Sequence, residues 1–63
     1  MKLSKWQKES GVNDEALARA VNIHPSLLSH IRAGRRRPSP ELAKRIEEAT
    51  GGKVTRIELL YPD

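Results

Sequence analysis

Apolar side chains recur at intervals of three and four residues along most of the chain, the spacing that gathers side chains on one face of an α-helix. Short polar or glycine-containing stretches separate these periodic segments. No stretch alternates for long enough to build a sheet, although residues 53–60 leave open a single edge strand. The pattern therefore predicts an all-α fold, a compact bundle of about five short helices.

The first helix is expected over residues 3–10, with Trp6 packed into the core. Gly11 supplies the left-handed residue that commonly ends a helix. An alternative start places Ser4 at the cap, with Gln7 as its reciprocal partner. The two starts differ by a few residues and leave the rest of the fold unchanged.

A second helix is expected over residues 14–21, preceded by Asn13 as its N-cap. Acidic residues in its first turn suit the positive end of the helix dipole. Asn22 follows, one of the few non-glycine residues that tolerate the left-handed conformation closing such a helix. The side chains expected to face inward are Leu17, Ala18 and Val21.

A third helix is expected over residues 25–33. His24 takes the cap position, and Pro25 occupies the first helical position, where proline is well tolerated. Leu28 and Ile31 lie on its predicted buried face.

Two further helices are expected towards the end of the chain. Ser39 caps a helix that starts at Pro40, with an apolar stripe of Leu42, Ile46 and Ala49. Thr55 and Glu58 have the spacing of a capping box, which predicts a last helical turn. This turn is expected to bury Ile57, Leu59 and Leu60.

The length of 63 residues predicts a single domain, residues 1–63, with one core too small to enclose a substrate. The chain has no cysteine, so its stability must come from packing rather than disulfides. No apolar run approaches the roughly 20 residues of a membrane span, and the basic start lacks the apolar region of a signal peptide. We therefore expect a cytoplasmic protein without membrane contact or small-molecule substrate.

Positive charge is concentrated in one window of the sequence. Residues 32–45 carry six basic residues and one acidic residue, whereas the rest of the chain carries six basic and seven acidic residues. The whole excess of +4 therefore comes from this window. Such a focused patch indicates a polyanionic partner, with nucleic acid as the first candidate.

The spacing of Ala18, Asn22, Leu28 and Ile31 is that of a helix-turn-helix unit, here residues 14–33. Together with the GRRRP loop and the added helices, the string LARAVNIHPSLLSHIRAGRRRPSPELAKRIEEATGGKV resembles the lambda repressor and Cro-like helix-turn-helix family of phage and prophage regulators. The TGGKVT…PD ending is similar to a small Cro-type subgroup that includes YdaS-like prophage proteins. The resemblance covers nearly the whole chain.

The resemblance implies a regulator that binds double-stranded DNA, with residues 25–33 as the recognition helix in the major groove. Three positions depart from the family pattern, and the first and third departures affect affinity and specificity rather than binding itself. Asp14 stands where the family often has a glutamine on a phosphate, and Asn22 replaces the commoner glycine. Pro25 and Leu27 leave the start of the recognition helix poor in hydrogen-bonding side chains.

The residues expected to read bases lie opposite the buried face of the recognition helix: Ser26, Ser29, His30, Ala33 and, at the margin, Leu27. Hydroxyl and imidazole groups bond base edges, whereas Leu27 or Ala33 would touch a thymine methyl. The alternatives are that Ser29 lies on a merely solvated face and that Leu27 belongs to the core.

The residues expected to contact phosphates are the arginines after the recognition helix and their neighbours: Arg35, Arg36, Arg37, Arg32 and Lys44. The amides at the start of the second helix, beside Asn13, are a further candidate because of the helix dipole. The alternative is that three adjacent arginines form a solvated charge run.

Other chemistry has little support in the sequence. Ser26 and His30 have the spacing of a nucleophile and its base, but no orienting acid or oxyanion hole accompanies them, so no enzyme is expected. The two histidines lack metal-site spacing, and no metal or cofactor is expected. Two aromatic residues far apart supply no stacking platform for single strands.

Two functional hypotheses follow. The first is a sequence-specific repressor that occupies an operator as a homodimer, at least on DNA. The second is an antitoxin or adaptor that acts mainly through protein contacts, suggested by the apolar segment around residues 57–61.

Overall fold

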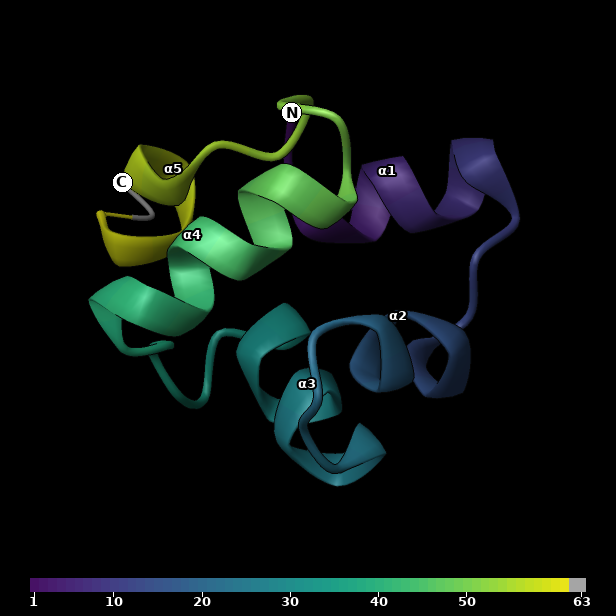
Figure 1. Ribbon diagram of the computed structural model, residues 1–63, viewed down its shortest axis with the longest axis horizontal. Coiled ribbons are helices and arrows are strands. Elements are labelled where there is room, and N and C mark those ends of the chain that lie inside the picture. Colours follow the sequence, from purple (N-terminus) through teal and green to yellow (C-terminus); the bar gives the residue numbers. More distant parts are fainter. Residues whose placement is uncertain (62–63) are drawn as a thin grey trace.

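The computed structural model describes residues 1–61, which contain five α-helices and no strand (Figure 1). The helices are α1 (Leu3–Ser10), α2 (Asp14–Ala20), α3 (Pro25–Arg32), α4 (Pro40–Ala49) and α5 (Arg56–Leu60). The predicted all-α bundle is therefore confirmed. Pro62 and Asp63, which end the family-like segment, lie outside the described residues. No helix within residues 1–61 is long and apolar enough to cross a lipid bilayer.

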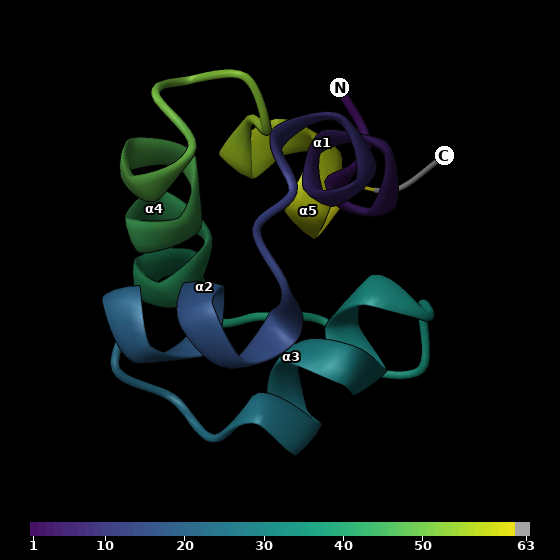
Figure 2. The same cartoon turned by 90° about the vertical axis from the view of Figure 1, so that its right-hand side faces the viewer.

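The helices form two packed pairs around one core. α2 packs against α3, and α4 packs against α5. Figures 1 and 2 show α3 at the bottom of the molecule, with α1 and α5 above it and α4 along one side. At the centre lie the fully enclosed side chains of Leu17, Leu28, Ile46 and Val54. Because this core is shared between the pairs, it fixes α3 relative to the rest of the bundle.

Helix starts are set by local side-chain caps. In α2 to α5 the N-cap side chain accepts a hydrogen bond from a backbone N–H two or three residues further on, and these caps are Asn13, His24, Ser39 and Thr55. A cap of this kind contributes about 1 kcal/mol. Only α1 begins without one, at Lys2. The alternative start with Ser4 as a cap is wrong, because Ser4 lies inside α1.

The turn between α2 and α3 is closed by backbone hydrogen bonds around Asn22. The N–H of Asn22 donates to the carbonyl of Arg19 at 3.2 Å, and the N–H of Ile23 donates to that of Ala18 at 2.9 Å. This is a Schellman arrangement, which needs a left-handed residue between helix end and exit, and Asn22 has φ of 62°. Ile23 then packs on the core. The predicted turn is confirmed at Asn22.

The loop between α4 and α5 buries a residue that the periodic pattern misses. Val54 has no exposed surface and Thr50 only 4%. The N–H of Val54 donates to Oγ1 of Thr50 at 3.1 Å, and that hydroxyl in turn lies 3.1 Å from the carbonyl of Glu47, to which it donates. Val54 lies in no helix, so helical periodicity gives no signal for it.

The apolar face predicted for α5 is partly wrong. Ile57 is 67% exposed, whereas Leu59 is half-buried against the core and Leu60 is half-buried. Ala49 of α4 is also exposed, although the helical spacing predicts it on the apolar stripe. Trp6 packs against the core but remains partly accessible. A helix of five residues buries only the side that meets α4, so its other side chains face outward.

Candidate nucleic-acid interface

α3 presents polar side chains away from the bundle. Ser26 and His30 are exposed one turn apart, and Ser29 between them is half-buried. Ala33 is exposed but caps the end of the helix, which is one residue shorter than expected. The buried side of the same helix carries Leu28 and Ile31 as predicted, which fixes the direction that the polar side chains face.

Leu27 lies between these two faces of α3. It is half-buried and packs against the core, as one of the two interpretations of its position expects. The part of its side chain that stays accessible is at the margin of the outer face. Contact with a thymine methyl stays a prediction.

Ser26 has a partner that the sequence did not suggest. Its hydroxyl lies 2.8 Å from Nδ1 of His24, and its backbone N–H donates to the same nitrogen at 3.1 Å. Because Nδ1 accepts the backbone proton, the neutral ring carries its own proton on Nε2. The hydroxyl of Ser26 therefore points towards the cap and not towards His30, the pairing that a nucleophile and its base would need.

The arginine loop, residues 33–37, is fastened to the end of α3. The N–H groups of Arg35 and Arg36 both donate to the carbonyl of His30, at 2.9 and 3.3 Å. Gly34 has φ of 80°, which reverses the chain at this point. Pro38 at the end of the loop is buried. The backbone is therefore held at both ends, while the three arginine side chains remain exposed.

Two of the basic side chains in residues 32–45 form ion pairs with carboxylates and are therefore less available to a partner. Arg32 lies 2.8 Å from Asp14 and Arg45 lies 2.9 Å from Glu41. No carboxylate within residues 1–61 pairs with the remaining basic side chains of residues 32–45, which are Arg35, Arg36, Arg37 and Lys44. The unpaired positive charge of this window is thus concentrated on the arginine loop and one lysine of α4.

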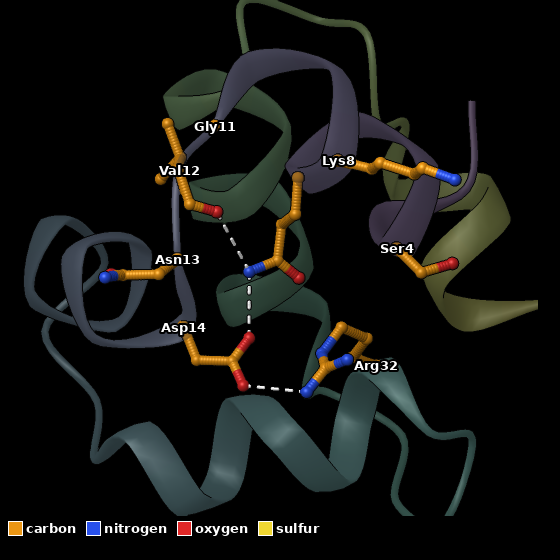
Figure 3. A pocket seen from close by; sticks show the side chains of 8 residues that line it. Ser4, Lys8, Gly11, Val12, Asn13, Asp14 and Arg32 are labelled. Carbon is orange, nitrogen blue, oxygen red and sulfur yellow. Dashed lines mark hydrogen bonds and ion pairs between the residues drawn. The ribbon is translucent and has the colours of Figure 1, made fainter.

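Asp14 holds together the start of α2 and the end of α3 (Figure 3). Nε2 of Gln7 donates to one of its carboxylate oxygens at 2.8 Å, and Arg32 donates to the other at 2.8 Å. The hydrogen bond from Gln7 and the charge of Arg32 hold the pKa of Asp14 below its ordinary value, against the opposing effect of burial. The negative charge that would repel a DNA phosphate here is therefore already paired.

A shallow, open depression of about 420 Å³ lies beside this network, between α1 and the start of α2. It is lined by Lys8, Asn13, Asp14 and Arg32, among others. The side-chain oxygen of Asn13 is occupied, because it accepts the N–H of Ala16 at 2.8 Å. Any phosphate near Asn13 would meet its amide NH2 group or backbone N–H groups rather than that oxygen.

Within residues 1–61, no three His, Asp or Glu side chains come together in a way that would hold a metal ion. The features that do come together are an exposed polar helix, a capped turn before it and an arginine loop after it. These are the features of a helix-turn-helix domain.

The sequence profile of the helix-turn-helix family matches residues 4–57, and the chain belongs to this family. The resemblance to lambda repressor and Cro-like regulators is thereby confirmed. The protein is a DNA-binding regulator of this type. No curated protein and no solved structure matches the chain.

Proposed function

We propose that the protein is a sequence-specific repressor of the phage or prophage Cro type, which occupies an operator through residues 25–33 as a homodimer. The observation that carries this proposal is the arginine loop, whose three exposed side chains have no carboxylate partner within residues 1–61 and follow directly after α3. A recognition helix contacts bases in the major groove through polar side chains, while neighbouring positive charges contact the phosphates and fix its position. An exposed polar helix beside a positively charged loop meets both requirements.

In this proposal α3 lies in the major groove with its first turn nearest the bases. Ser26 and His30 bond base edges, and Ser29 does so from a half-buried position. Leu27 and Ala33 supply apolar contact with thymine methyl groups. Because a serine bonds several bases almost equally well, His30 carries most of the discrimination.

Phosphate contacts come from the unpaired cations. Arg35, Arg36 and Arg37 meet the backbone beside the groove, and Lys44 extends the same surface. The amide group of Asn13 and the start of α2 approach a phosphate on the other side of the turn. Arg32 joins these contacts only when it leaves Asp14, since its guanidinium is paired in the free protein.

The homodimer follows from operator geometry rather than from contacts within one chain. A single helix of eight residues reads only a few base pairs, and two copies on half-sites about 34 Å apart double that length. The bound dimer would then repress transcription simply by occupying DNA that RNA polymerase also requires.

Titration of the protein with duplex DNA over a range of salt concentrations tests the proposal. The logarithm of affinity should fall linearly with the logarithm of salt concentration, by about 0.9 per neutralised phosphate. Binding that is absent, or that salt does not weaken, would refute it. Selection of bound sites from random duplexes should then return a two-fold symmetric sequence; an asymmetric or unselected pool would refute the dimeric repressor.

Two variants separate affinity from specificity. Arg36→Ala should weaken binding to every duplex alike and reduce the salt slope by about 0.9. Lys53→Ala is the matched control, because Lys53 is equally exposed but lies on the loop at the opposite end of the molecule from α3. His30→Ala should change which sequences are selected. An unchanged selection profile for His30→Ala would show that the groove face is assigned wrongly.

A second candidate function, an antitoxin or adaptor that acts through protein contacts, is favoured by one observation. Ile57 and Tyr61 are 67% and 71% exposed at the α5 end of the molecule, where their side chains are accessible to a protein partner. Sedimentation with and without duplex DNA distinguishes the candidates. A strict monomer in both conditions would count against the dimeric repressor.

A further inference from the structure

A groove of about 670 Å³ runs between the start of α1, the end of α3, the arginine loop and α5. Its floor is formed by the half-buried side chain of Leu59, which lies over the buried core side chains of Leu3, Ile31 and Val54. Figures 1 and 2 both show α1 and α5 above α3, and the groove lies between these elements.

The rim of the groove is positively charged. Lys2, Arg36 and Arg37 line it, and no carboxylate within residues 1–61 pairs with any of them. Arg32 lines it as well, although Asp14 already holds its charge. Among residues 1–61, the one acidic lining residue is Glu58, whose carboxylate is paired with the N-terminal ammonium group. The groove thus combines an apolar floor with unbalanced positive charge at its edge.

Tyr61 stands at the edge of the groove and is 71% exposed. Tyrosine offers a large apolar ring and a hydroxyl group with little conformational freedom to lose, which is why interfaces favour it. An exposed tyrosine beside an apolar floor indicates a surface that a partner covers.

We propose that this groove docks an acidic amphipathic segment of a partner protein, a helix with apolar side chains on one face and carboxylates beside them. The apolar face would fill the floor against Leu59 and Tyr61, and the carboxylates would pair with Arg36 and Arg37. Nucleic acid fits less well, because its charged phosphates would make no favourable contact with apolar side chains on the floor.

A second copy of this chain also fits less well. In a two-fold dimer the same patch of both copies enters the interface, so two grooves with positive rims would face each other. Like charges placed opposite each other across an interface cost several kcal/mol. The sign of the rim therefore points to a partner of opposite charge.

The groove and the proposed DNA surface share Arg36 and Arg37. A segment bound in the groove would neutralise both and deny them to the phosphates. The partner would thus act as an inducer that releases the protein from DNA. The docking itself does not depend on the DNA proposal, because it is measured without DNA.

The probe is a fluorescently labelled synthetic peptide with leucines at positions i, i+3, i+4 and i+7 and glutamates at most other positions, titrated with the full chain. Saturable binding, with amide NMR shifts centred on the groove residues, is the expected result. A peptide of the same composition without an apolar face should bind at least about tenfold more weakly. Equal binding of the two peptides would overturn the proposal, because the surface would then select only charge.

Matched variants locate the binding. Tyr61→Ser and the double variant Arg36→Ser with Arg37→Ser should each weaken the amphipathic peptide about tenfold. Ile57→Ser and Arg35→Ser should change its affinity less than about twofold, because both side chains are exposed neighbours that do not line the groove. All the substituted positions are exposed, so the variants should keep their helical circular dichroism. If the groove variants and the neighbouring control variants changed the affinity for the peptide equally, the peptide would not bind in this groove and the proposal would be overturned.

Two further measurements test the occupant of the groove and its effect on DNA binding. Sedimentation should show that Tyr61→Ser leaves the oligomeric state unchanged. A dimer that this variant dissociates would overturn the proposal by making the groove an interface between copies. In a mixture with duplex DNA, the amphipathic peptide should displace the protein, and simultaneous binding of both would overturn the inducing role. If the protein bound the peptide but did not bind duplex DNA, the repressor proposal would be refuted and the docking proposal would stand.

Discussion

Asp14 links two helices whose relative position matters for groove entry, which makes Asp14→Asn an informative substitution. The shape of the side chain is kept, and Oδ1 of an asparagine can still accept the hydrogen bond from Gln7. The contact with Arg32 is lost, because an amide NH2 group replaces the carboxylate oxygen that lies 2.8 Å from the guanidinium. The substitution therefore removes one ion pair and one charge at the start of α2 and little else.

The loss of stability follows from the exposure of the pair. The side chains of Asp14 and Arg32 are 27% and 40% exposed, so solvent screens their attraction and the pair is worth about 0.5–1 kcal/mol. The negative charge at the first position of α2 adds about 0.3–1 kcal/mol through the helix dipole. The sum, about 1–2 kcal/mol, is a large part of the roughly 3–9 kcal/mol expected for a chain of this length. The melting temperature should fall by about 4–8 °C for each kcal/mol.

Thermal and urea unfolding followed by circular dichroism measure this loss, with Glu15→Gln as the control. Glu15 is in the same first turn, so both variants lose a similar dipole interaction. Its pair with Arg19 is 3.6 Å long with both side chains more than 70% exposed, and contributes little. Asp14→Asn should therefore cost about 0.5–1 kcal/mol more than Glu15→Gln. Equal losses would refute a stabilising role for the pair.

The difference should also depend on pH in a defined direction. Because folding lowers the pKa of Asp14, the stabilisation is complete above the unfolded value of about 3.9 and is lost as pH falls through the lower folded value. Wild type and Asp14→Asn should therefore approach each other in acid. A gap that widened in acid would contradict the assigned direction of the shift.

DNA affinity should change in the opposite sense to stability. Asp14→Asn removes a negative charge near the proposed phosphate site and frees Arg32 for a phosphate. A gain of about 1 kcal/mol, or about fivefold, is expected, with a salt slope steeper by about 0.9. Adding Arg32→Ala to Asp14→Asn should abolish the steeper slope. If Asp14→Asn left both affinity and slope unchanged, Asp14 would not limit phosphate contact.

Two further predictions concern the fold. Val54→Ala should destabilise the protein by about 2 kcal/mol, as measured by urea unfolding, because its side chain is fully enclosed and the loop around it is held by Thr50; a loss below about 0.5 kcal/mol would show that this loop does not contribute to the core. Asn22→Ala should cost about 1–2 kcal/mol, since alanine tolerates a φ of 62° poorly, whereas Asn22→Gly should change stability by less than about 1 kcal/mol. Equal stability of the two Asn22 variants in thermal unfolding would contradict the left-handed turn.

Much of the helix-turn-helix unit could be predicted from the sequence because its determinants are local. A cap such as Asn13 or His24 acts on an N–H only two or three residues away. The left-handed turn at Asn22 likewise depends on residues within one helical turn. Leu28 and Ile31 repeat at helical spacing, so their burial could be predicted as well.

Only the tertiary structure decided which charges are available at the candidate site. The sequence shows that six basic residues lie within residues 32–45, but it does not show which of them form ion pairs. Asp14 and Arg32 are 18 positions apart and meet only because α3 folds back on α2. Because Asp14 pairs with Arg32, the positive charge available to a partner comes mainly from the arginine loop.

Burial near the end of the chain also depended on the packing of α5 against α4. Val54 and Ile57 are both branched apolar residues three positions apart, yet one is fully enclosed and the other is 67% exposed. The difference arises because the loop bonded to Thr50 turns Val54 into the core, whereas α5 meets α4 with its other side. Local sequence determined that a helix forms here. The docking of that helix on α4, which is a tertiary contact between two helices, determined which of its side chains remain exposed.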